Sequence, residues 1–356
     1  MTNAAAIDRQ SFLNRAGQYI TRIRNFVLNS FFVVATLFVL ASLLGSCESE
    51  SVPKGSALFI NPVGALVEQT SPPLSFPDAL LQSGPVQETA INNVLKAIDL
   101  AAEDDDIKLI VLDLDDLFYA SSAQTLRIGK ALTDFKAGGK NVVAYADYFE
   151  QFQYHIASYA NELYMHPMGQ ALLTGYGGNN LYFREMLEKL SINMHVFKVG
   201  GFKSAVEPFT RDNMSEQAKL ANQTLYNGLW RALVEDLAGN RQLPVADIEA
   251  YSQQFSVLLK KAGGDMARTA LEAKLVDELL TRDQVRARIA DKVGWLEENE
   301  RLNAIGMSSY LQLRQEFPMP EDDEQIAVLV AQGTICLLYT SPSPRDKRQS
   351  RMPGCG

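Results

Sequence analysis

Lys203 is the residue whose surroundings point most clearly to chemistry, and it lies in the stretch VFKVGGFKSAVEPF from Val196 to Phe209. No other charged residue occurs from Val199 to Val206. A lysine serves as a general base near neutral pH only when burial lowers its pKa of about 10.4 by roughly two to three pH units. The pattern fits the amine of a Ser/Lys pair, in which lysine takes the serine proton, and the alternative is an exposed loop lysine.

A second candidate is the aspartate pair in IVLDLDD (110–116), at the end of an apolar run. Two aspartates at this spacing could hold magnesium and attack a phosphate, with Asp113 as the nucleophile and Asp115 as the acid or base. Leu117 stands where such phosphatases carry threonine or valine. A magnesium-dependent phosphatase is therefore the less favoured alternative.

Other reactive residue types are scarce, and none forms a recognised site. The three cysteines form no CxxC pair, and they are Cys47, Cys336 and Cys355. The three histidines lie in apolar or aromatic surroundings typical of packed or half-exposed side chains, and they are His155, His166 and His195. GxSxG does not occur, so we expect no Ser-His-Asp triad. The cysteines and histidines indicate neither a disulfide framework nor a zinc site, and we expect no cofactor.

Composition sets the class of protein. The chain has 356 residues, of which 47% are hydrophobic and 21% charged, and this balance is typical of a folded protein with a sizeable core. Its net charge of −9 disfavours nucleic acid as a partner.

The elements that must position Lys203 follow an α/β pattern. Short apolar runs predict buried strands at 57–60, 107–114, 141–146, 162–165 and 194–199. Apolar residues three and four apart predict helices at 88–105, 122–139 and 215–241, with more helix to about residue 295. Alternation of strands and helices favours an α/β fold with a largely parallel sheet.

The N-terminal region predicts a membrane anchor. Residues 26–44 are nineteen predominantly apolar residues, enough helix to span a bilayer. Arginines precede the apolar run and glutamates follow it, so we expect residues 1–24 in the cytoplasm, an anchor at 25–47, and the remainder across the membrane. A cleaved signal peptide and a lipidated Cys47 are the minor alternatives.

Several segments together resemble one family. HVFKVGGFKSAVEPFTRDNMSEQAK (195–219) is similar to the matching part of the signal peptide peptidase A family, also called protease IV and peptidase family S49, of the long bacterial type. The likeness extends through 129–167, 174–192 and 270–281, and it covers most of residues 20 to 335.

The resemblance implies a duplicated ClpP/crotonase-like α/β spiral with one N-terminal transmembrane helix, assembled as a homotetramer. It implies a serine peptidase on the periplasmic side of the bacterial inner membrane, which degrades cleaved signal peptides and other hydrophobic peptides. Lys203 matches the general base of the family, whose serine lies in the second half. Gln151 stands about where a serine would lie in the first half, so we expect no second nucleophile there.

The same resemblance divides the chain. After a linker at 48–55, residues 56–323 form the first ClpP/crotonase-like domain with a helical extension, and 324–335 begin a second repeat.

Residues 336–356 begin with CLLYTSPSPRD, which a sequencing-library adapter encodes in this frame, so we expect an artefactual tail and a truncated chain.

Three functions follow from these patterns. The favoured one is the Lys-bearing half of a Ser/Lys peptidase, which is inactive alone because its nucleophile is missing. The second is a noncatalytic membrane-anchored α/β scaffold with Lys203 as a loop residue. The third is the phosphatase, which depends on Asp113 and Asp115 rather than on Lys203.

Overall fold

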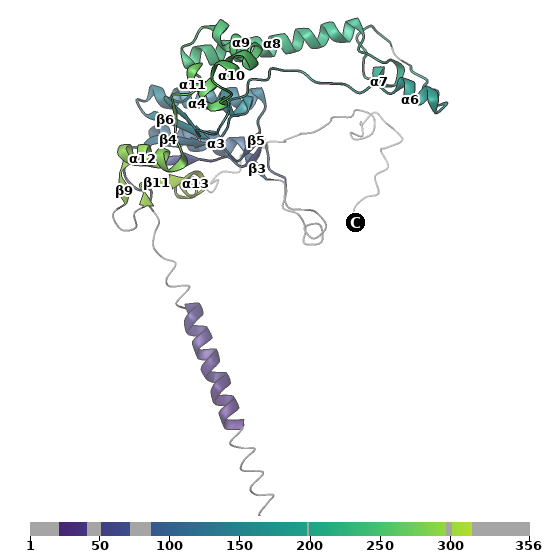
Figure 1. Cartoon of the computed structure of the whole chain (residues 1–356). Coiled ribbons are helices and arrows are strands. Elements are labelled where there is room, and N and C mark those ends of the chain that lie inside the picture. The colour runs from purple at the N-terminus through teal and green to yellow at the C-terminus, as the bar shows by residue number, and fades with distance from the viewer. Residues whose placement is uncertain (1–20, 41–50, 72–86, 198, 297–300, 315–356) are drawn as a thin grey trace, which may run out of the picture. The chain divides into compact units, whose positions relative to one another are not determined.

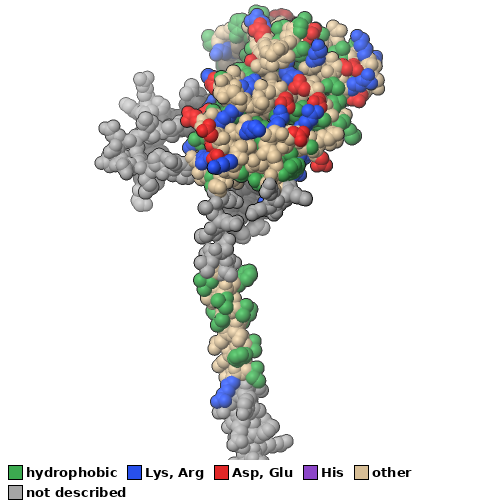
Figure 2. Space-filling view, turned by 90° about the vertical axis from the view of Figure 1, so that its left-hand side faces the viewer, with side chains coloured by type: hydrophobic (Ala, Val, Ile, Leu, Met, Phe, Trp, Pro, Cys, Tyr) green, Lys and Arg blue, Asp and Glu red, His purple; other side chains and the backbone are tan. Residues whose placement is uncertain are grey.

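The computed structural model describes residues 21–40, 51–71, 87–197, 199–296 and 301–314 (Figure 1). The chain divides into two compact units between Ser51 and Val52. In the first unit, the helix Thr21–Leu40 is exposed throughout and is long and apolar enough to cross a membrane. Figure 2 shows hydrophobic side chains along this helix and Lys or Arg side chains at one end of it.

Parts of the predicted domain plan fall outside the described residues. These are residues 1–20 of the N-terminal segment, the end of the predicted anchor with Cys47, residues 48–50 of the linker, the start of the second repeat at 324–335, and the tail at 336–356.

The second unit is built on a six-stranded sheet in which every neighbouring pair of strands is parallel. Its order is β11 (Ala304–Gly306), β1 (Ser56–Ile60), β4 (Ile107–Asp113), β6 (Asn141–Ala146), β7 (Glu162–Met165) and β8 (Glu278–Leu279). The four predicted strands from 57 to 165 coincide with β1, β4, β6 and β7. Continuous apolar runs are typical of parallel strands because helices cover both faces of the sheet.

The second unit also contains a smaller parallel sheet. It consists of β3 (Glu88–Ala90), β2 (Gly64–Val67) and β5 (Leu117–Tyr119) in that order. The first turn of the chain contributes β1 to the large sheet, β2 and β3 to the small sheet, and then the helix α3 (Ile91–Glu103). The second turn contributes β4 to the large sheet, β5 to the small sheet, and then the helix α4 (Ser122–Ala137). The third turn follows with β6 and α5 (Gln151–Ala157). This repeated succession is the α/β spiral predicted from the sequence.

The two faces of the large sheet are covered by different helices. On β4, Ile110 and Leu112 belong to the larger apolar cluster, to which α3, α4, α5 and α13 (Met307–Arg314) contribute. Leu109 and Val111 face the other way, into a smaller cluster beneath α12 (Arg282–Val293). Alternate residues of a strand point to opposite faces, which explains this division.

Further elements lie between β7 and β11 in the chain. They include α9 (Val245–Gln253), α10 (Phe255–Lys261), α11 (Met266–Glu272), and the antiparallel pair β9 (Trp295–Leu296) and β10 (Arg301–Leu302). Helical structure thus continues to Val293, as the sequence predicts. Side-chain caps begin several helices, and Ser121 with Gln124 forms a capping box at the start of α4.

A long helix, α8 (Glu216–Arg241), joins the core to a segment that we call the arm, residues 181–225. The arm carries α6 (Arg184–Lys189) and α7 (Glu207–Thr210), which lie near the end of α8 that is remote from α9 in Figure 1. The C-terminal half of α8 packs on the core through Leu233, Val234 and Leu237.

Two secondary-structure predictions are wrong in part. The predicted helix at 88–105 begins as β3, because Glu88 to Ala90 pair with β2 before α3 starts. The predicted strand at 194–199 is absent from the described residues of that range, where Phe197 and Val199 are 97% and 90% exposed. The apolar pattern there is the same as in a buried strand, but the segment lies on the arm rather than in the sheet.

Candidate functional site

Lys203 lies on the arm, in the connection between α6 and α7, and its side chain is exposed. It makes no hydrogen bond or ion pair with the described residues. Gly200 just before it has φ +101°, a left-handed conformation that glycine adopts readily. The side chain of Lys203 is accessible to solvent on this turn.

The apolar residues around Lys203 in sequence are exposed as well. Phe202 is 65% exposed, and Phe197 and Val199 are almost fully exposed. The desolvated environment that a general base needs is not supplied by the described residues of this chain. Clustered exposed apolar side chains are typical of surfaces that another polypeptide covers.

Glu207 fixes the base of the Lys203 loop. Its side chain is buried, and its carboxylate accepts a hydrogen bond of 3.0 Å from the backbone N–H of Ser215, the N-cap residue of α8. The backbone N–H of Glu207 in turn donates to the carbonyl of Ser204 at 3.0 Å. The loop bearing Lys203 is thus tied to the start of α8, so the orientation of that helix governs where the lysine is presented.

Contacts between α6 and α7 hold the rest of the arm together. The rings of Phe183 and Phe209 stack with centroids 6.2 Å apart, and the backbone N–H of Phe183 donates to the carbonyl of Pro208 at 2.7 Å. Arg184 forms an ion pair with Asp212. The arm is therefore a locally ordered unit whose outward surface carries Lys203.

Gln151, predicted to replace a serine, is the first residue of α5 and borders a cavity of about 520 Å³. Its side-chain oxygen accepts a hydrogen bond of 2.8 Å from the backbone N–H of Gly175, and its amide nitrogen donates to the carbonyl of the same residue at 3.4 Å. Both polar atoms of the Gln151 side chain are thus occupied by the backbone of Gly175.

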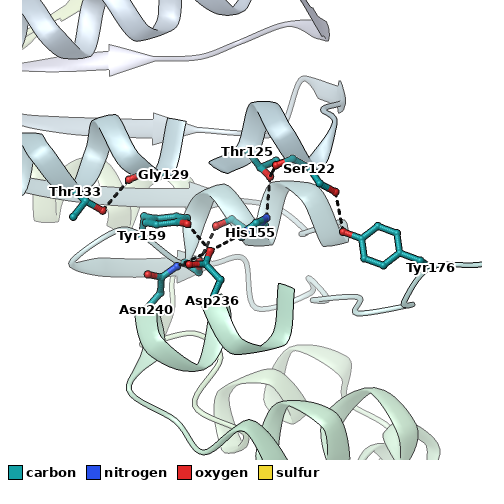
Figure 3. A network of polar contacts seen from close by, with 10 residues as sticks. Ser122, Thr125, Gly129, Thr133, His155, Tyr159, Tyr176, Asp236 and Asn240 are labelled. Carbon is teal, nitrogen blue, oxygen red and sulfur yellow. Dashed lines mark hydrogen bonds and ion pairs between the residues drawn. The ribbon is translucent and has the colours of Figure 1, made fainter. Parts of the chain in front are cut away.

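A buried polar network adjoins this cavity and links three helices (Figure 3). His155 of α5 is 4% exposed, and its Nε2 lies 2.6 Å from Oδ2 of Asp236 on α8. Its Nδ1 lies 2.9 Å from Oγ1 of Thr125 on α4. The Thr125 hydroxyl also donates to the carbonyl of Ser122 at 2.9 Å, and each ring nitrogen of His155 has a polar partner.

Other side chains converge on the same carboxylate. Asp236 also accepts hydrogen bonds from the Tyr159 hydroxyl and, at 3.4 Å, from the Asn240 amide. Burial alone would raise the pKa of Asp236, but the hydrogen bonds from His155 and Tyr159 outweigh it and hold that pKa below its ordinary value. The network therefore fixes the C-terminal half of α8, and through it the arm, to the core.

The sequence did not reveal this network. His155 and Asp236 lie 81 residues apart, and the surroundings of His155 predicted only a packed or half-exposed side chain. The histidine is indeed packed, but it also pairs with a carboxylate. His166 is half-buried and His195 exposed.

The aspartate pair proposed for a phosphatase is engaged by an arginine. Arg282 at the start of α12 donates from Nη1 to Asp113 at 2.7 Å and from Nη2 to Asp115 at 2.5 Å. Burial raises the pKa of Asp115, although the hydrogen bond from the backbone of Asp147 and the charge of Arg282 oppose that shift. The guanidinium holds both carboxylates, in the role that the phosphatase interpretation gives to magnesium. Among the described residues, no group of three or more His, Cys, Asp or Glu side chains is arranged to hold a metal ion.

Comparison with known proteins identifies the relatives of this chain. Residues 134–295 match peptidase family S49. Protease 4 of Salmonella typhi is 34% identical over 322 residues, which cover 88% of this chain and 51% of that protein. Protease 4 of Haemophilus influenzae is 33% identical over 320 residues, covering 88% of this chain and 52% of that protein. The chain spans about half the length of these relatives.

Among solved structures, ThnE from S. clavuligerus aligns with a TM-score of 0.27 at 11% identity, over 63% of this chain and 84% of that one. The parallel sheets and the strand–strand–helix succession define an α/β spiral protein. Residues 134–295 form a peptidase family S49 domain, and the two relatives named Protease 4 support the family that the sequence resemblance implied.

Proposed function

We propose that this chain is the Lys-bearing part of a serine peptidase in which Lys203 is the general base of a Ser/Lys dyad. The observation that carries the proposal is the position of Lys203 on the arm, exposed among apolar side chains. A lysine in that position becomes a base when another surface covers it, because desolvation disfavours the ammonium form. A second repeat that also bears the serine supplies that surface.

The family S49 domain supports peptides as the substrates, and we propose signal peptides and other hydrophobic peptides in particular. The helix Thr21–Leu40 would anchor the chain in the bacterial inner membrane. Arg22 and Arg24 at its start favour a cytoplasmic N-terminus, with the second unit in the periplasm. The exposed apolar side chains of the arm are consistent with contacts in a homotetramer.

We propose that this chain has no peptidase activity by itself. Lys203 lacks an apolar cover within the described residues, and Gln151 stands where a first-half serine would lie. A base without a nucleophile cannot form an acyl-enzyme.

The test is complementation. The full chain is co-expressed with the part of Salmonella typhi Protease 4 that it does not cover, and cleavage of a hydrophobic peptide is measured. We expect no cleavage by the chain alone, cleavage by the pair, and a loss of about 100-fold or more with Lys203→Ala. Lys189→Ala, an exposed lysine at the end of α6, is the matched control and should retain activity.

Three contrary outcomes would each contradict a different part of the proposal. Cleavage by the chain alone, lost in Lys203→Ala, would show that the nucleophile lies within this chain. A pair that assembles and cleaves equally well with Lys203→Ala would remove Lys203 from the mechanism. A pair that assembles but never cleaves would favour the noncatalytic scaffold.

A further inference from the structure

A second cavity, remote in the fold from the arm, lies between α12 and the large sheet. Its volume is about 360 Å³, within the range of small-ligand pockets. Six apolar residues form most of its wall, and they are Phe59, Val111, Val285, Ile289, Leu302 and Ala304. A concave, mostly apolar pocket with a few polar groups at its margin is typical of a binding site.

Three charged side chains border this cavity, and two of them neutralise each other. Asp113 is held by Arg282, whose second Nη atom binds Asp115 and whose guanidinium lies 5.3 Å from the centre of the Tyr145 ring. Arg286 is exposed and forms no ion pair or hydrogen bond within the described part of the chain. Arg286 is therefore the charge at the cavity that is available to a ligand.

The helix α12 places this arginine beside the apolar wall. Val285 and Arg286 each lie three or four residues from both Arg282 and Ile289, so the four side chains lie along one side of the helix. Val285 and Ile289 are buried against the sheet, whereas Arg286 stands at the margin of the cavity. The pocket consequently combines an apolar interior with a cation at its entrance.

We propose that this cavity binds the C-terminal residue of a short apolar peptide, with its side chain in the apolar interior and its carboxylate on Arg286. The inference rests on the proposed peptidase function for the source of the ligand. Hydrolysis adds water across the peptide bond, and it leaves a carboxylate on one product and an amine on the other. Each cut therefore creates a new carboxylate terminus at a residue that was internal in the uncut chain.

The position of β11 favours a peptide over an acyl chain. Ala304 of β11 lines the cavity, and β11 is the last strand of the described sheet on that side. An edge strand offers backbone N–H and C=O groups with which an extended peptide can pair. A fatty acid would use the apolar wall and Arg286 but not these backbone groups.

The experiment measures binding and does not require cleavage. The full chain in lipid nanodiscs is titrated with a fluorescently labelled Ala-Leu-Leu tripeptide that ends in a free carboxylate, and with its C-terminal amide. We expect the acid to bind about tenfold more tightly than the amide, and Arg286→Gln to remove that difference. Arg288→Gln is the matched control, because Arg288 lies on the same helix but pairs with Glu278 at 2.7 Å.

A cavity-filling variant, Ala304→Phe, should weaken binding of both peptides while Arg286 remains in place. Equal affinity for the acid and the amide, or an unchanged preference in Arg286→Gln, would overturn the proposal. Dodecanoate that displaces the peptide and binds more tightly would assign the cavity to an acyl chain instead. If the chain binds the acid selectively but the complemented pair does not cleave, the result supports this binding site and contradicts the peptidase proposal.

Discussion

The core and the arm both contain large apolar side chains, but they use them in opposite ways. In the core, Phe135, Phe149 and Tyr154 are completely buried. On the arm, Phe197 and Val199 are almost completely exposed. Burial in the first region stabilises the fold of the chain, whereas exposure in the second leaves the same kind of side chain available for another polypeptide.

This difference explains why Lys203 could not be interpreted from its neighbours in sequence. Apolar neighbours desolvate a lysine only when they pack around it, and on the arm they do not. The proposed base therefore requires a surface beyond the described residues, while the spiral core folds around its own apolar clusters.

The largest expected effect is on the stability of the core. Phe135→Ala should lower the free energy of unfolding by about 3 to 5 kcal/mol, because it opens a cavity under α4. Phe197→Ala on the arm should change it by less than about 0.5 kcal/mol. Denaturant unfolding followed by circular dichroism compares the two variants, and similar losses in both would contradict the distinction between core and arm.

The link between core and arm should have an intermediate effect. His155→Ala leaves the Asp236 carboxylate and the Thr125 hydroxyl without this partner, so we expect a loss of about 1 to 3 kcal/mol in the free energy of unfolding. His166→Ala is the control, since His166 is half-buried and accepts only a local hydrogen bond from the backbone of Met168. An equal effect of both substitutions would show that the network does not stabilise the chain.

The same network predicts a pH dependence with a definite sign. The pKa of Asp236 is lower in the folded chain than its ordinary value, so the unfolded chain binds more protons at this site. Its stabilisation is complete above about pH 4 and is lost as the pH falls through the folded pKa. Asp236→Asn should therefore lower the free energy of unfolding at pH 7 and make it decrease less steeply below pH 4, as measured by denaturant unfolding between pH 2.5 and 7. An unchanged pH dependence would show that Asp236 does not contribute to acid unfolding.

The smallest global effect should come from the base of the arm. Glu207→Gln weakens the hydrogen bond to the backbone N–H of Ser215, so we expect faster hydrogen exchange of the Ser215 amide with a change below about 1 kcal/mol in global stability. Glu216→Gln, an exposed glutamate at the start of α8, is the control and should leave this exchange unaltered. Unchanged exchange in Glu207→Gln would mean that other contacts fix the loop.

The large sheet was predictable because its strands are continuous apolar runs such as IKLIVLD in β4, and both faces of the sheet are buried. The segment at 194–199 has the same pattern and forms no strand in its described residues, since pattern alone does not distinguish packing within a chain from packing against a partner. The pairs His155–Asp236 and Asp113–Arg282 were not predictable, because 81 and 169 residues separate the partners and no local signal marks them.

The most direct test of the central claim compares two exposed phenylalanines. A benzophenone photo-crosslinking residue replaces Phe197 on the arm or Phe118 on the edge strand β5, which is 67% exposed, in the chain co-expressed with the complementing part of the relative. We predict crosslinks to that complementing polypeptide from position 197 and none from position 118. An active pair without a crosslink from position 197, or with equal crosslinks from both positions, would contradict the claim that the arm is covered by a second repeat.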